Sequence, residues 1–227
     1  MGKRPNGYIG FEYDLTPYLN FGSKDNTIVV KADNSDQPNS RWFSGSGIYR
    51  NVWLKKLSKI HIPNWGTFIT TPNISEEKAL VNITAEIKNE FAKDKEIEVQ
   101  VTIFQDDQEI VKSETSALSI TANSAINFNK ELTILNPKLW SVDSPSLYKA
   151  QIDIIQNKNH IDRFETSFGI RDFEFDLEKG FILNGKSQKI RGVCMHHDLG
   201  PLGAAINIRA IERQLEILKE MGVNGIR

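Results

Sequence analysis

Two short stretches near the C-terminal end carry the side chains best suited to chemistry. His196, His197 and Asp198 are consecutive, and Arg227 follows a later apolar stretch. Imidazole and carboxylate groups exchange protons and hydrogen-bond ligands, and a guanidinium donates several hydrogen bonds at once. The triplet is open to three interpretations: a polar turn, a binding site or a metal site. Metal binding is disfavoured, because adjacent side chains of an extended segment point in opposite directions.

A strand, a helix and a second strand are predicted to position these residues. The first strand runs from Lys189 to Met195, and the second from Val223 to Ile226. Between them, Asn207 has the residue type of a helix N-cap and Gly222 stands where a C′ glycine belongs. The apolar residues of this helix fall on one face: Ile208, Ile211, Leu215 and Leu218. The pattern predicts a βαβ unit with parallel strands and a right-handed crossover.

The βαβ unit places the polar residues at the same edge of a sheet. In a β/α barrel the working side chains follow the C-terminal ends of the strands. His196, His197, Asp198 and Arg227 would therefore share one rim. One crossover cannot cover both faces of a parallel sheet, so we expect either further α/β chain or another chain to complete it, and favour the former.

Upstream, the dominant signal is an alternation of apolar and polar residues between Thr27 and about Phe175. Such alternation is typical of half-buried antiparallel strands, and the turn residues between them suit a sandwich. The alternating segments are Ile28–Val30, Leu80–Ile87, Ile97–Ile103, Ile126–Ile134 and Tyr148–Ile154, and a strand-like run extends from Ile48 to Ile62. A strand leading into an Asn-Gly hairpin turn is predicted from Phe181 to Lys186.

These signals predict a mainly β protein in three parts. A boundary precedes the turn-rich Pro63–Gly66, and the pattern changes after Arg171. The parts are residues 1–57, with too few strands for a sandwich of their own; residues 58–171, an immunoglobulin-like β-sandwich; and residues 172–227, the βαβ unit.

Composition excludes several classes of protein. The chain has 28 Lys and Arg against 29 Asp and Glu, so no basic field exists to hold nucleic acid or an anionic membrane. Its apolar runs are too short for a membrane-spanning helix. The single cysteine, Cys194, cannot form an intramolecular disulfide or a thiolate metal cluster. Met1–Pro5 has no apolar h-region, so no signal peptide is expected.

Several stretches, in order along nearly the whole chain, resemble glycoside hydrolase family 2, the family of β-galactosidases, β-glucuronidases and β-mannosidases. Ser44–Leu54 reads S-G-S-G-I-Y-R-N-V-W-L, which resembles the family's S-G-x-x-R-x-V-W-L motif. Phe181–Asp198 resembles the entry to the catalytic barrel, and Asn224–Arg227 resembles the opening of its N-x-x-R-x-S-H signature. The other similar stretches are Gly7–Thr16, Trp140–Tyr148 and Phe168–Arg171.

The resemblance implies that residues 1–57 belong to a partial sugar-binding jelly roll and residues 172–227 to the start of a TIM barrel. It implies retaining hydrolysis of terminal β-galactosides by two carboxylates, both expected beyond Arg227, so the chain alone should be inactive. His196 matches the family histidine that contacts the sugar, and Arg227 matches the arginine that braces the site. Asp198 and His197 are further candidates for substrate contact. No cofactor is implied, and a homo-oligomer is left open.

One departure concerns a metal. Some family members have an aspartate before the tryptophan of the jelly-roll motif, which binds a sodium ion, whereas this chain has Asn39-Ser40-Arg41 before Trp42. We therefore expect no metal site here. Arg41 and Trp42 stay candidates for sugar contact or for packing between domains. The alternatives to a β-galactosidase are a β-glucuronidase of the same family and a non-catalytic carbohydrate-binding or spacer module, and the resemblance favours the bacterial periplasm over the cytoplasm.

Overall fold

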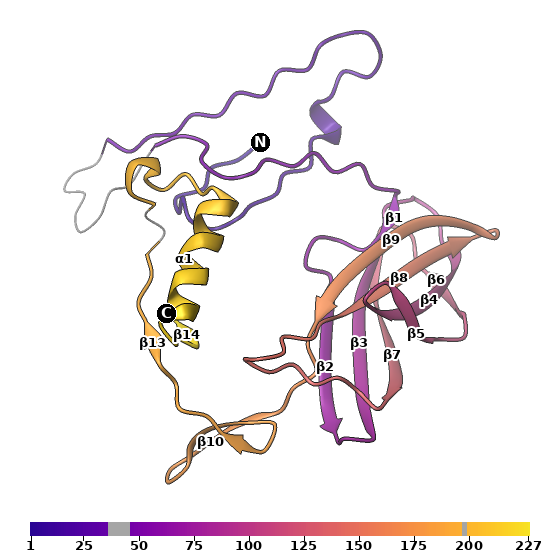
Figure 1. Cartoon of the computed structure of the whole chain (residues 1–227). Helices are drawn as coiled ribbons and strands as arrows, with labels where there is room; N and C mark the ends of the chain where they lie inside the picture. Colours follow the sequence, from indigo (N-terminus) through magenta and orange to yellow (C-terminus); the bar gives the residue numbers. More distant parts are fainter. Residues whose placement is uncertain (36–45, 197–198) are drawn as a thin grey trace. The chain divides into compact units, whose positions relative to one another are not determined.

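The computed structural model describes residues 1–35, 46–196 and 199–227. The chain forms two compact units, Met1–Val52 with His196–Gln214 and Trp53–Met195 with Leu215–Arg227. Most of the regular structure is β-strand, as predicted (Figure 1). Each unit is described by itself.

One sheet of the second unit is built around a long central strand. This strand, β3 (Lys78–Asn89), pairs antiparallel along its whole length with β7 (Ser124–Leu135). On its other side it pairs with β2 (Thr67–Ile74) and β1 (Ile60–His61). These strands make a four-stranded sheet.

The other sheet has five strands and is also antiparallel. Its central strand β4 (Lys95–Gln105) pairs with β8 (Tyr148–Gln156) on one side. On the other side β4 pairs with β5 (Gln108–Lys112) and β6 (Ser116–Ile120), and β8 pairs with the edge strand β9 (Asn159–Phe168). Figure 1 shows both sheets in the magenta and orange part of the chain.

The core of this sandwich follows from the alternation of residues. Along β3 every second side chain, from Ala79 to Ile87, is at most 1% exposed, while the intervening residues are partly exposed. Residues of β4 and β8 such as Val101 and Ile152 belong to the same buried cluster. Burying an aliphatic side chain of this size contributes about 1.5–3 kcal/mol. The strands predicted at 80–87, 97–103, 126–134 and 148–154 are confirmed.

Two strand predictions nearer the N-terminus are wrong. Ile28–Val30 forms no strand, and the run from Ile48 to Ile62 is a strand only at Ile60–His61. The physical reason is the lack of a covering layer, since Val29 is 82% and Val52 is 75% exposed. Among the described residues of 1–57, the regular element is a single 3₁₀ turn, η1 (Thr16–Tyr18).

After the sandwich the chain forms a three-stranded antiparallel sheet of β10 (Phe173–Asp176), β11 (Gly180–Leu183) and β12 (Lys186–Ser187). The predicted Asn-Gly turn joins β11 and β12. Asn184 has φ 49° and Gly185 has φ 73°, the left-handed pair that a two-residue hairpin turn requires. This prediction is confirmed.

The predicted βαβ unit is also present. The strands β13 (Gly192–Val193) and β14 (Gly225–Ile226) pair in parallel, and the 3₁₀ turn η2 (Gly200–Leu202) and the helix α1 (Ile208–Glu220) lie between them in sequence. The Asn207 side chain accepts a hydrogen bond from the Ala210 amide at 3.3 Å, which makes it the N-cap. Gly222 has φ 82°, as a C′ glycine should. Both strands are shorter than predicted, and no residue of α1 is buried.

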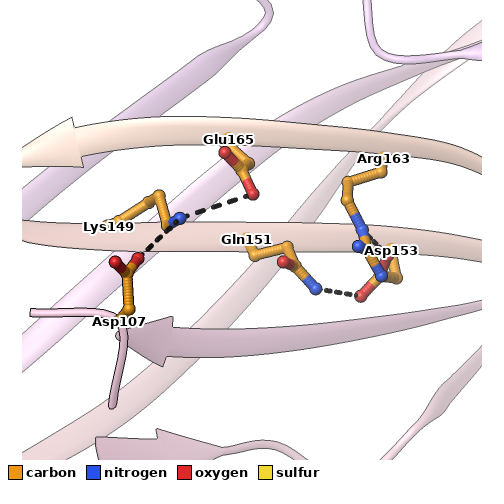
Figure 2. Close-up of polar contacts among 6 residues, drawn as sticks. All are labelled: Asp107, Lys149, Gln151, Asp153, Arg163 and Glu165. Carbon is orange, nitrogen blue, oxygen red and sulfur yellow. Dashed lines mark hydrogen bonds and ion pairs between the residues drawn. The ribbon is translucent and has the colours of Figure 1, made fainter. Parts of the chain in front are cut away.

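The outward face of β8 and β9 carries a network of charges (Figure 2). Asp153 is 3% exposed and accepts hydrogen bonds from Arg163 Nε and Gln151 Nε2, both at 2.7 Å. Burial alone would raise the Asp153 pKa, but these two hydrogen bonds and the charges of Arg163 and His160 outweigh it, so the pKa lies below its usual value. The paired carboxylate is therefore a structural part of the sandwich.

Candidate functional site

The carboxyl ends of β13 and β14 lie side by side. Gly192 is opposite Gly225, and Val193 is opposite Ile226. Beyond these pairs the Arg227 amide donates to the Val193 carbonyl, and the Met195 amide donates to the Arg227 carbonyl, both at 2.9 Å. The backbone of Arg227 is thus fixed beside the end of β13. This is the edge at which a parallel sheet presents its working side chains.

Arg227 has an exposed side chain at this edge. Its Nη1 lies 3.7 Å from the sulfur of Cys194, the residue that directly follows β13. A guanidinium carries five N–H donors in a rigid planar arrangement, so a single contact with sulfur engages only a small part of its capacity. The group suits hydroxyl or carboxylate oxygens of a ligand. Cys194 is itself exposed and forms no disulfide.

His196 comes directly after Met195, the last residue of this stretch that is bonded to Arg227, and its side chain is exposed. An exposed imidazole following a parallel strand can donate to or accept from a ligand. The other predicted site residues, His197, Asp198, Arg41 and Trp42, lie outside the described residues. The roles predicted for all six side chains stay predictions.

Sequence reasoning assigned no role to Asn224 and Arg191, although both lie in the stretches that carry the family resemblance. Asn224 Oδ1 accepts from the Arg191 amide at 2.7 Å, and Asn224 Nδ2 donates to the Lys189 carbonyl at 3.0 Å. The Arg191 guanidinium turns to the C-terminal end of α1, where its Nε donates to the Gly222 carbonyl at 2.7 Å. The only signal in the sequence was an asparagine just before the short strand β14. Its partners could not be predicted, because they are distant in sequence.

Two further properties bear on the chemistry. Within residues 1–35, 46–196 and 199–227, no group of three or more His, Cys, Asp or Glu side chains is arranged to hold a metal ion. In the same part of the chain, no helix has the length and apolarity needed to span a membrane.

Comparisons with known proteins give the family. Residues 60–171 match the model of Glycosyl hydrolases family 2. The chain is 48% identical over all 227 residues to the β-galactosidase BoGH2A of Bacteroides ovatus, of which it covers 27%. It is 38% identical over its whole length to a putative β-glucuronidase of Formosa agariphila, of which it covers 21%.

Solved structures agree with this result. The whole chain superimposes on 28% of a β-glycosidase from Bacteroides vulgatus, with a TM-score of 0.84 and 34% identity. It also resembles a β-glucuronidase of Bacteroides uniformis, with a TM-score of 0.77, 33% identity and coverage of 86% of this chain and 25% of that one. The chain therefore spans about a quarter of the length of these relatives. It belongs to glycosyl hydrolases family 2.

Proposed function

We propose that this chain is part of a longer retaining β-glycosidase that removes terminal β-galactosides, and that it supplies the supporting side of the active site. The observation that carries the proposal is the parallel β13–β14 pair, which holds Arg227 at the carboxyl edge of a sheet next to the end of β13. In a β/α barrel, the side chains that follow the C-terminal ends of the strands form the rim at which the substrate binds.

The reaction would use two carboxylates about 5–5.5 Å apart, one as nucleophile and one as acid and base. In the family both belong to later barrel strands, which would lie beyond residue 227. The residues of this chain would bind and orient the sugar. We assign hydroxyl contacts to His196 and Arg227, and further substrate contacts to Asp198 and His197.

Arg41 and Trp42 would contribute from residues 1–57. An aromatic ring can stack on the apolar face of a sugar, and a neighbouring guanidinium can bind its hydroxyl groups. This assignment rests on the position of both residues beside the family motif.

A β-galactoside is favoured over a β-glucuronide by the relatives. Identity to the Bacteroides ovatus β-galactosidase is 48%, against 38% for the Formosa agariphila putative β-glucuronidase. The likeness to the Bacteroides uniformis β-glucuronidase supports the glucuronide as the second candidate. A glucuronidase needs additional cations for the substrate carboxylate, and these would come from the part of the barrel that follows.

The test is a comparison of nitrophenyl β-galactoside and nitrophenyl β-glucuronide as substrates of the longer protein. We expect the galactoside to be preferred. His196→Ala should lower kcat/KM by about 100-fold, because a hydrogen bond that strengthens in the transition state contributes roughly 3 kcal/mol. His197→Ala is the matched control. An equal loss for His197→Ala with none for His196→Ala would show that the wrong histidine was chosen.

A further inference from the structure

We propose that Asn224 is a positioning residue, which sets the register of β13 and β14 and thereby the place of the Arg227 guanidinium. The inference rests on the proposed function for its catalytic consequence, but not for its structural part. We call the hydrogen bonds between Asn224, Arg191, Lys189 and Gly222 the Asn224 clasp.

The strands themselves specify their register weakly. Each has 2 residues, and they share two residue pairs, Gly192 with Gly225 and Val193 with Ile226. A parallel pair is slightly less stable per residue than an antiparallel one, and an isolated two-stranded pairing is marginal. Glycines provide no side chain that would distinguish one register from the next.

The Asn224 side chain supplies the missing specificity because it imitates a peptide group. Its oxygen faces the Arg191 N–H and its nitrogen faces the Lys189 carbonyl, while its backbone N–H donates to the Arg191 carbonyl at 3.0 Å. One side chain thus extends the ladder beyond the two-residue strands. A shift by one residue would bring the Asn224 side chain opposite peptide groups that point away from it, because successive peptide groups of a strand face opposite sides. Its oxygen and its nitrogen would then both lose their partners.

Arg191 closes the clasp from the other strand, since its Nε donates to the Gly222 carbonyl where the helix ends. The backbone at Gly225 also lies close to the segment that precedes β13. A Cβ on Gly225 would lie 3.1 Å from Ile190 Cγ2, which is tighter than ordinary contact. The clasp and the glycine therefore favour one close register.

The register of β13 and β14 decides where the Arg227 side chain points. Arg227 follows Asn224 along the same strand, and its backbone continues the ladder to Val193 and Met195. A shift of one residue would move Arg227 by about 3.3 Å along the strand and turn its side chain to the opposite face. The Asn224 clasp thus fixes a guanidinium that it does not touch.

The structural part is tested on this 227-residue chain by amide hydrogen exchange. We expect Asn224→Ala to reduce the protection of the Met195 and Arg227 amides by about 10-fold or more. Asn224→Asp keeps the acceptor for Arg191 but places an oxygen against the Lys189 carbonyl, so it should act similarly. Lys189→Ala is the control, because the clasp uses only the backbone of that residue. Protection that is equal in the unchanged chain and in Asn224→Ala would overturn the proposal.

The functional part is tested on the longer protein with nitrophenyl β-galactoside. Misplacing Arg227 should lower kcat/KM by about 10- to 100-fold in Asn224→Ala. The same substitution should have little additional effect in an Arg227→Ala background, since both changes remove one contribution. If the losses of kcat/KM in the two single variants add in the double variant, the positioning role of Asn224 is overturned. If the unchanged longer protein hydrolyses neither glycoside, the proposed function fails, and the exchange experiment still decides the clasp.

Discussion

The side-chain amide of Asn184 donates a hydrogen bond to the backbone carbonyl of Trp140 at 3.0 Å. Its Oδ1 also accepts from the Asp172 amide at 3.0 Å. Trp140 is fixed to the sandwich by its own amide, which donates to the Ile170 carbonyl at 2.8 Å, and the Arg171 guanidinium lies 5.0 Å from the centre of the Trp140 ring. One asparagine therefore anchors the β11–β12 hairpin to the sandwich.

Replacing Asn184 should loosen this anchor in two separable steps. Asn184→Gly removes both side-chain hydrogen bonds but tolerates the positive φ, and should cost about 1–2 kcal/mol. Asn184→Ala adds the strain of a left-handed alanine and should cost about 1–2 kcal/mol more. Amide exchange in β10 and β11 measures both effects. Protection unchanged in Asn184→Gly would show that the turn is held by other contacts.

Arg163 should stabilise the sandwich more than the neighbouring charge of the same strand. Arg163→Gln removes the guanidinium from the buried Asp153 carboxylate and leaves His160 and Gln151 beside it, and we expect a loss of about 1–3 kcal/mol, limited because the Arg163 side chain is 54% exposed. Glu165→Gln is the matched control. It removes an ion pair of 3.7 Å to Lys149, which Asp107 also contacts, and should change stability by no more than about 0.5 kcal/mol (Figure 2). Urea unfolding followed by circular dichroism distinguishes the two variants. Equal losses of unfolding free energy would contradict the larger role assigned to Arg163.

Acidification should remove the contribution of Asp153. Its pKa in the folded chain lies below the value of about 3.9 in the unfolded chain. The stabilisation is therefore fully present above about pH 4 and is lost as the pH falls through the lower, folded-state pKa. The difference in unfolding free energy between the unchanged chain and Asp153→Asn should shrink over this range. A difference independent of pH between about pH 6 and pH 2 would exclude this role of the carboxylate.

The sandwich should fold without the rest of the chain. All residues of the buried core cluster lie between Ile60 and Ile170. We therefore expect residues 58–171 alone to give a monomer with a cooperative unfolding transition. The whole chain, in which α1 has no buried residue and Ile208 is 70% exposed, should show weak protection of its helix amides or should self-associate. Size-exclusion chromatography with light scattering tests both, and a monomeric whole chain with strongly protected helix amides would contradict the second expectation.

The chain by itself should hydrolyse no glycoside. The proposed mechanism assigns its two carboxylates to barrel strands that are not among residues 1–227, and a chain without them should lack a rate enhancement of about 10⁶-fold or more. Release of nitrophenol from nitrophenyl β-galactoside by the purified chain, compared with a mock preparation, measures this. Turnover above the mock level would contradict the assignment of the reacting groups.

Local signals in the sequence were sufficient for much of the fold. The alternation at Leu80–Ile87 and Tyr148–Ile154 predicts strands because one face of each is apolar over its whole length. Asn207, Gly222 and the Asn184–Gly185 turn act through their own backbone conformation or that of close neighbours. Each of these features is determined within a few residues, so the sequence alone reveals it.

Only the tertiary structure decided the features that depend on distant partners. Ile28–Val30 has the composition of a strand but no covering layer, and it forms none. Asn224 meets Arg191 and Lys189 across separations of 33 and 35 residues, which no local pattern encodes. The same holds for Asp153, which occupies a polar position of an alternating strand and yet is buried. It is stable there because Arg163 reaches it from the adjacent strand. A side chain's role in these cases is set by the groups that folding brings to it, since a hydrogen bond or ion pair forms only where both partners meet.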